Sequence, residues 1–227
     1  MLKKKKISRK ELLSKPDEYI SLSVKILDFI SYHKKTFIIS GIIFVFILSL
    51  ISGFAFYGKH LEARAQRLLY QADQYIYHEK NEEILKNYLI NINRIIDEYS
   101  NTYAANYALL FLGNHFYRLK DYDKSIDCYN KFLNGKVKVK YLRAMVYNSI
   151  GYCYQEQGNY EKAIDNFYEI IKIKRNIFNE TTYLHLGECY EKLNNKDKAI
   201  DSYQKLINQY PHTYYINIVE GKISKLK

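Results

Sequence analysis

The sequence predicts an all-α protein: one membrane-spanning helix near the N-terminus, then a stack of about four helical hairpins closed by a C-terminal capping helix. Two observations lead to this prediction. Residues 36–58 form an apolar stretch without a charged residue, and a glycine-centred pattern recurs three times after it. We therefore divide the chain into a basic segment (1–35), a spanning helix (36–58), a degenerate hairpin (59–100) and a regular array (101–227).

The net charge of +11 is concentrated before the apolar stretch. Residues 1–35 contain ten Lys and Arg against four Asp and Glu, and residues 59–227 carry the remaining +5. A nucleic-acid-binding protein more often carries its basic charge on the folded domain, so this distribution indicates a membrane and no nucleic acid. The N-terminal lysines suit contact with lipid headgroups, and a cytosolic partner is the alternative.

The apolar stretch has the length and composition of a transmembrane helix. Its 23 residues include fourteen Ile, Leu, Phe or Val, and at ~1.5 Å per residue they cross a hydrocarbon core of ~30 Å. No small-x-small cleavage site follows, so we expect the helix to remain in the mature chain. The excess of basic residues before it predicts a cytoplasmic N-terminus. Gly41, Ser49 and Gly53 share one face and could pair two such helices into a homo-oligomer.

A second helix is expected just before the span, within residues 14–35. Ser14 is a candidate N-cap, and Pro16 would fall in the first turn. An apolar stripe follows at helical spacing, which favours a short amphipathic helix lying on the inner leaflet. The stripe consists of Tyr19, Leu22, Ile26, Phe29 and Ile30.

The repeat is centred on Gly113, Gly151 and Gly187. A small residue follows each glycine by twelve positions (Ser125, Ala163, Ala199) and an aromatic residue follows by sixteen (Tyr129, Phe167, Tyr203). Small residues let two helices approach closely, and the aromatic rings fill the volume beside them. Each unit is therefore predicted to be a helical hairpin that buries its face only by stacking on its neighbours.

The turns inside the hairpins also carry a signature. Gly158 and Asn194 can adopt the left-handed conformation that ends a helix. The next residue in each repeat is a good N-cap for the second helix. These three residues are Asp121, Asn159 and Asn195.

These segments resemble tetratricopeptide repeats over residues 104–211. The family spacing is about 34 residues, whereas these glycines lie 38 and 36 apart. Pro211 matches the closing proline of the motif, and Val137 and Arg175 replace it in the other two repeats. Residues 61–98 resemble a degenerate further hairpin without the glycine, and residues 213–226 would cap the stack.

The whole layout resembles the YfgM-type membrane proteins of diderm bacteria. That resemblance implies an inner-membrane, single-pass protein whose repeats face the periplasm and accompany the Sec translocon and periplasmic chaperones. Translocon subunits, periplasmic chaperones and secreted peptides are then the expected partners, beside membrane lipid. The alternative is a self-assembling factor of the cell envelope, of division or of outer-membrane assembly, although the lipidated cysteine of the outer-membrane assembly lipoprotein is missing here.

In tetratricopeptide arrays the first helix of each hairpin lines a concave groove, so the resemblance also implies partner-binding residues. We count these positions from each repeat glycine. They include the residue three positions before the glycine, which is Leu110, Asn148 or Leu184 in the three repeats. A solvated face, or cover by the chain's own N-terminal helix, is the alternative. The candidate groove residues are Asn114, Tyr117, Arg118, Asn148, Tyr152, Gln155, Glu156, Glu188, Glu191 and Lys192.

The sequence shows no signature of catalysis. The six histidines lack metal-ligand spacing, and the one helical pair, His185 and Glu188, has no second pair to complete a site. No phosphate-binding loop or nucleophile elbow occurs. We therefore expect a non-enzymatic scaffold without metal or cofactor. The three cysteines are expected to be small buried residues, with reactive thiols as the alternative.

Overall fold

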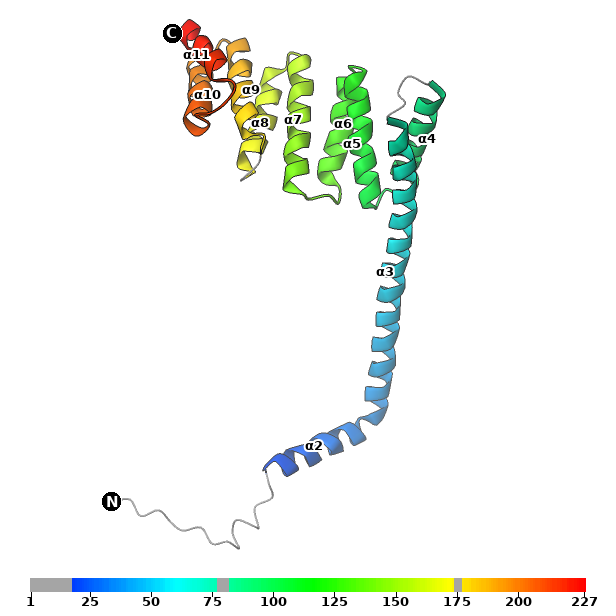
Figure 1. The fold of residues 1–227 in the computed structure, drawn as a ribbon. Helices are drawn as coiled ribbons and strands as arrows, with labels where there is room; N and C mark the ends of the chain where they lie inside the picture. Colours follow the sequence, from blue (N-terminus) through cyan, green and yellow to red (C-terminus); the bar gives the residue numbers. More distant parts are fainter. Residues whose placement is uncertain (1–17, 77–81, 174–176) are drawn as a thin grey trace, which may run out of the picture. The chain divides into compact units, whose positions relative to one another are not determined.

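The computed structural model describes residues 18–76, 82–173 and 177–227, and over these ranges it is helical without a strand (Figure 1). This agrees with the all-α prediction. The helices are α2 (Glu18–Tyr32), α3 (Lys34–Ile76), α4 (Glu82–Glu98), α5 (Tyr103–Arg118), α6 (Tyr122–Asn134), α7 (Lys140–Glu156), α8 (Tyr160–Lys172), α9 (Asn179–Lys192), α10 (Lys196–Gln209) and α11 (Ile216–Leu226).

Contacts divide the chain into two compact units, Met1–Tyr57 and Gly58–Lys227. The first unit contains α2 and the apolar part of α3. A stretch within Lys34–Ala72 has a mean hydropathy of 2.6, and none of its residues is buried. By length and composition it could cross a membrane. The candidate cap Ser14 and Pro16 lie outside the described residues.

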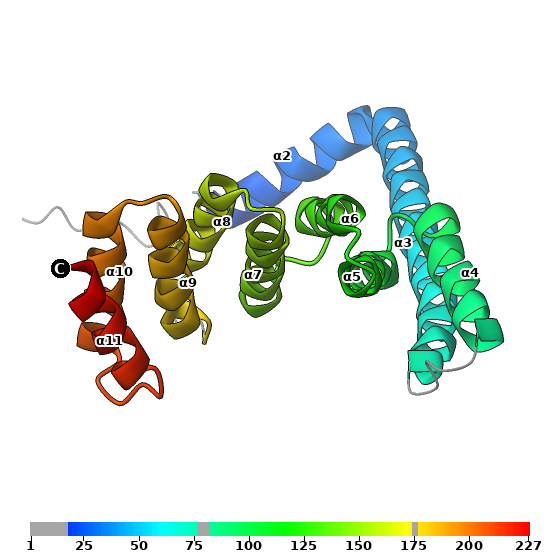
Figure 2. The ribbon, with the colours of Figure 1, turned by 90° about the horizontal axis from the view of Figure 1, so that it is seen from above.

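The second unit is an array of antiparallel hairpins. Helices α5 and α6, α7 and α8, and α9 and α10 form three hairpins that follow one another side by side (Figure 2). Before them, α4 and the end of α3 take the place of the degenerate hairpin. Ala65 and Ala72 of α3 share one buried cluster with Tyr88 and Ile92 of α4.

The glycine–aromatic pairs meet as the repeat predicts. A Cβ atom on Gly113 would lie 2.6 Å from the Tyr129 ring, and those on Gly151 and Gly187 would be closer still to Phe167 and Tyr203. All three rings are almost completely buried. The small residue of each unit is buried too, at Ser125, Ala163 and Ala199.

The turns within the hairpins have the predicted conformation. Gly158 has a φ of 73° and Asn194 a φ of 57°, and Lys120 occupies the equivalent position with a φ of 60°. The following residue caps the second helix in every case. Its side chain accepts a hydrogen bond from the backbone N–H three residues later, at Asp121, Asn159 and Asn195.

Helix α11 closes the array. Val219 and Ile223 are buried against the last hairpin in one cluster with Tyr203 and Leu206 of α10. Val137, which replaces the closing proline of its repeat, is also buried, whereas Arg175 lies outside the described residues. The array therefore ends in a helix that covers the apolar face of the final repeat.

Candidate functional site

Two hollows lie along the first helices of the hairpins, and Tyr152 lines both. The first has a volume of about 470 Å³ and is built by α4, α5, α6 and α7. Its lining consists of Tyr88, Phe111, Asn114, Tyr117, Arg118, Tyr129, Ser149 and Tyr152. Aromatic rings make up most of this lining, and the guanidinium of Arg118 is its only fixed charge.

Burial raises the pKa of two phenols that line the first hollow, Tyr129 and Tyr117. The Tyr129 hydroxyl donates to Asn114 Oδ1 at 2.7 Å. Burial raises the pKa of Tyr129 to about 12, and burial followed by the nearby Glu156 raises the pKa of Tyr117. The hollow therefore offers apolar ring faces and neutral hydroxyls to a ligand.

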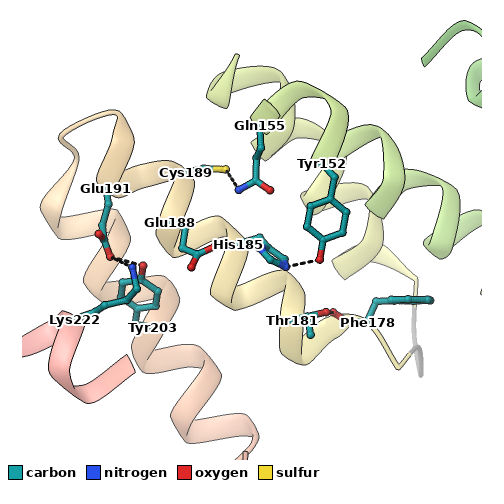
Figure 3. A network of polar contacts seen from close by, with 10 residues as sticks. All are labelled: Tyr152, Gln155, Phe178, Thr181, His185, Glu188, Cys189, Glu191, Tyr203 and Lys222. Atoms are coloured by element: carbon teal, nitrogen blue, oxygen red, sulfur yellow. Dashed lines mark hydrogen bonds and ion pairs between the residues drawn. The ribbon is translucent and has the colours of Figure 1, made fainter. Parts of the chain in front are cut away.

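The second hollow is polar, with a volume of about 530 Å³. It is built by α7, α8, α9 and the capping helix α11 (Figure 3). Three carboxylates and two ammonium groups face it, together with one imidazole. Its lining consists of Tyr152, Gln155, Glu156, Tyr160, His185, Glu188, Glu191, Lys192 and Lys222.

His185 joins the two repeats that form the second hollow. Its Nε2 lies 2.7 Å from the Tyr152 hydroxyl, and its Nδ1 lies 3.1 Å from Glu188 Oε2 (Figure 3). A carboxylate only accepts hydrogen bonds, so the contact with Glu188 requires a proton on Nδ1, and in that tautomer Nε2 accepts from the Tyr152 hydroxyl. The proton on Nδ1 then points to Glu188, and this hydrogen bond is the main cause that lowers the pKa of that carboxyl. Both ring nitrogens are occupied, so His185 is not poised to bind a metal with Glu188.

Glu191 connects the groove to the capping helix. Its Oε1 accepts hydrogen bonds from the Tyr203 hydroxyl and from Lys222 Nζ, the latter at 3.0 Å. The Lys222 ammonium also lies 5.6 Å from the centre of the Tyr203 ring. Burial and the neighbouring carboxylate raise the pKa of Tyr203. The second hollow is thus completed by a helix that lies outside the repeats.

Nine of the ten residues expected in the groove line one of the two hollows. Asn148 lines neither: it is half-buried on α7, one turn before Tyr152. Within the described residues its Oδ1 is a buried side-chain acceptor that finds no hydrogen-bond partner. The structure adds Tyr88, His185 and Lys222, which the glycine-based counting did not select.

The row three residues before each glycine points inward. Leu110 and Leu184 are buried in the core. Asn148, which occupies the equivalent position in the second repeat, is half-buried. The expectation that Leu110 and Leu184 face the groove is therefore wrong. Neighbouring hairpins pack over this row, so it serves the contact between repeats.

A comparison with protein families identifies the hairpins. The family model of the tetratricopeptide repeat matches residues 103–176 and again residues 142–211. Residues 103–211 are tetratricopeptide repeats. This confirms the resemblance seen in the sequence over residues 104–211. A comparison with curated proteins found no matching sequence.

Solved structures resemble this chain at low sequence identity. The MamA protein is 18% identical, with a TM-score of 0.54, over 71% of this chain and 85% of that chain. The first tetratricopeptide domain of Spaghetti, bound to an HSP90 peptide, is 16% identical, with a TM-score of 0.44, over 53% and 89%. PcrH in complex with the chaperone-binding region of PopB is 16% identical, with a TM-score of 0.43, over 55% and 96%. At 18% identity the likeness to MamA concerns the fold alone.

Proposed function

We propose that this chain is a membrane-anchored, non-enzymatic scaffold whose tetratricopeptide groove binds a segment of a partner protein. The observation that carries the proposal is the pair of adjoining hollows that share Tyr152. One is lined by rings and the other by charges, so together they offer an anchor pocket next to a polar surface. This combination suits an extended peptide or a partner helix.

The apolar stretch of α3 supports the anchoring part of the proposal. We place residues 36–58 across the inner membrane as a single span, with the basic segment 1–35 and α2 on the cytoplasmic side. The exposed side chains of Ile26, Phe29 and Ile30 suit the inner leaflet. The repeats then face the periplasm, near the Sec translocon and its periplasmic chaperones.

Protease protection tests the orientation. In intact cells the repeats should resist an added protease until the outer membrane is permeabilised, after which they should be digested while residues 1–35 remain protected. Digestion of residues 1–35 at that stage, with protected repeats, would reverse the proposed topology.

Site-specific photo-crosslinking tests the groove. A photoactivatable residue at Tyr117 or Gln155 should capture translocon subunits, periplasmic chaperones or secreted proteins in intact membranes. The matched control is the same residue at Asp165, an exposed position on α8 that lines neither hollow. Equal capture at Asp165, or capture of only a second copy of the chain, would contradict the groove proposal. Homotypic capture would instead favour self-assembly through Gly41, Ser49 and Gly53.

A further inference from the structure

The two long edges of the hairpin array differ in character. We call the loops between successive hairpins the loop edge (residues 99–103, 135–141, 177–178 and 210–214). The turns within the hairpins, with the first residues of the helices after them, form the turn edge (119–124, 157–162 and 193–198). In Figure 1 the loops between hairpins lie along the lower side of the array and the turns along the upper side.

Exposed apolar side chains gather on the loop edge. Large exposed apolar residues occur in all four of its stretches, whereas Leu119 is the one such residue on the turn edge. Tyr214 is 97% exposed, and Tyr141 lies against Phe178 with ring centres 5.6 Å apart. The exposed members are Tyr103, Val139, Tyr141, Ile177 and Tyr214.

The charges of the two edges differ as well. No Asp or Glu occurs in the four stretches of the loop edge, which contain Lys136, Lys138 and Lys140. The turn edge mixes five lysines with four carboxylates. Two carboxylates outside the stretches bond to them: Glu62 accepts from the Tyr103 N–H and Glu180 from the Thr213 hydroxyl. With these two paired, tyrosine and lysine dominate the edge, which is the composition of a surface that meets lipid headgroups.

A hollow of about 490 Å³ opens in the loop edge between the first and second hairpins. Lys131, Lys136 and Lys138 line it, and no carboxylate does. The Lys136 ammonium donates to the Asn101 carbonyl at 2.7 Å, which holds the two loops together. Lys131 also pairs with Asp127 at 2.7 Å. The positive charge that the other two lysines leave at the hollow suits a phosphate group.

The chain enters the array at this same edge. Glu62 accepts hydrogen bonds from the backbone N–H groups of Tyr103 (2.7 Å) and Ala104 (3.1 Å), so this part of α3 lies beside the first stretch of the loop edge. Glu62 follows Gly58, the last residue of the apolar stretch, by four positions, or ~6 Å of helix. The first stretch of the loop edge therefore lies beside the part of α3 that directly follows the apolar stretch.

We propose that the loop edge docks on the anionic lipid surface of the membrane that holds the span, with a headgroup phosphate in the lysine-lined hollow. The tyrosines enter the headgroup layer and the lysines meet its negative charge. Docking would hold the array against the bilayer by two contacts, the span and the loop edge. This inference rests on the proposed anchoring but not on what the groove binds.

The chain contains no tryptophan, which makes a single-tryptophan reporter selective. The full chain carrying Tyr141→Trp is placed in nanodiscs of phosphatidylcholine, with or without phosphatidylglycerol, that contain brominated lipid. We expect a blue-shifted, quenched emission that is stronger with phosphatidylglycerol. Tyr214→Trp gives an independent reading at the far end of the edge, and Leu119→Trp on the turn edge is the matched control, expected to be unquenched.

Charge variants test the role of the lysines. Lys138→Gln with Lys140→Gln should lose the extra quenching of Tyr141→Trp in phosphatidylglycerol, whereas Lys196→Gln with Lys198→Gln on the turn edge should retain it. Inorganic phosphate in solution should not reproduce the blue shift, because the tyrosines require a bilayer.

Three outcomes would overturn the proposal: quenching no greater than that of Leu119→Trp, equal quenching in both lipids, or quenching insensitive to the lysine changes. A Phe46→Trp reporter inside the span separates these failures from a failure of anchoring. It should be quenched in both lipids if the span is inserted.

Discussion

Each repeat glycine packs against one aromatic ring, which leaves no room for a side chain at that position. Gly113 lies under Tyr129, whose hydroxyl is held by Asn114 on the same helix as the glycine. The ring cannot swing away without breaking that hydrogen bond and opening the core. The same side chain lines the first hollow, so the packing of the repeat and the shape of the groove depend on one residue.

Gly113→Ala should therefore destabilise the array by about 1–3 kcal/mol, the usual cost of overpacking a core. The measurement is denaturant unfolding of the full chain in detergent, followed by circular dichroism. Gly221→Ala is the control: nothing lies within 4 Å of the added Cβ, and alanine in a helix interior should stabilise by up to about 1 kcal/mol. Equal effects of the two changes would contradict the close glycine–ring contact.

The Tyr152–His185–Glu188 chain should make stability depend on pH. The hydrogen bond from His185 lowers the pKa of Glu188 in the folded state, so its stabilising contribution is present above the ordinary pKa of 4.5 and is lost as the pH falls through the folded value. Glu188→Gln should consequently be less stable than the wild type at neutral pH, and the difference should shrink below pH 4.5. Unfolding midpoints across this range measure the effect. A difference that stays constant with pH would mean that the charge of Glu188 contributes nothing.

At the scale of elements, the turn inside each hairpin requires one left-handed residue. Gly158, Asn194 and Lys120 fill equivalent places, and glycine or asparagine tolerates that conformation better than lysine. The first hairpin therefore carries a local strain that the other two avoid.

Replacing lysine by glycine and glycine by lysine at this position should change the free energy of unfolding in opposite directions. Lys120→Gly should stabilise the first hairpin by up to about 1 kcal/mol, and Gly158→Lys should destabilise the second by a similar amount. Both are measured by denaturant unfolding of the full chain. If both variants changed the free energy of unfolding in the same direction, the backbone angle at this position would not determine the stability of these turns.

The elements themselves were predictable because their signals are local. Hairpin turns, N-caps and glycine–ring pairs are set by residues within about twenty positions of one another, and the repeat displays each signal three times. The start of α5 has such a local signal too, in its N-cap Thr102, but one of its contacts was not predictable in this way. Its N–H groups are bonded by Glu62, more than forty residues earlier in the chain.

The lining of the two hollows overlaps the predicted positions for the same reason. Counting from the glycines selects positions on one helix, and nine of the ten selected residues do line a hollow. The count failed at the row of Leu110 and Leu184, because the next hairpin covers that side. It also missed Lys222, which reaches Glu191 from the capping helix and belongs to no repeat.

At the scale of the whole array, each hairpin is stabilised mainly by its neighbours. The clusters of buried residues follow this rule, since each joins adjacent hairpins. A change at one end should therefore loosen the nearest repeat and leave distant repeats unaffected.

Val219→Ala tests this, because Val219 is fully buried where α11 covers the last hairpin. Amide exchange should increase in α9 and α10 and remain unchanged in α5 and α6. Ile218→Ala changes the adjoining exposed residue and should leave exchange unaltered. Faster exchange throughout the array would instead indicate one cooperative unit.

The buried cysteines have a practical consequence for following how the array opens. Cys128, Cys153 and Cys189 lie in three different hairpins and all are buried. Burial raises their pKa, to about 11 for Cys128 and about 12 for Cys189, so almost no thiolate is present while the fold is intact. An alkylating reagent can then react only when a hairpin parts from its neighbour. Mass spectrometry of the three alkylated peptides would time the opening of each hairpin in the unaltered chain.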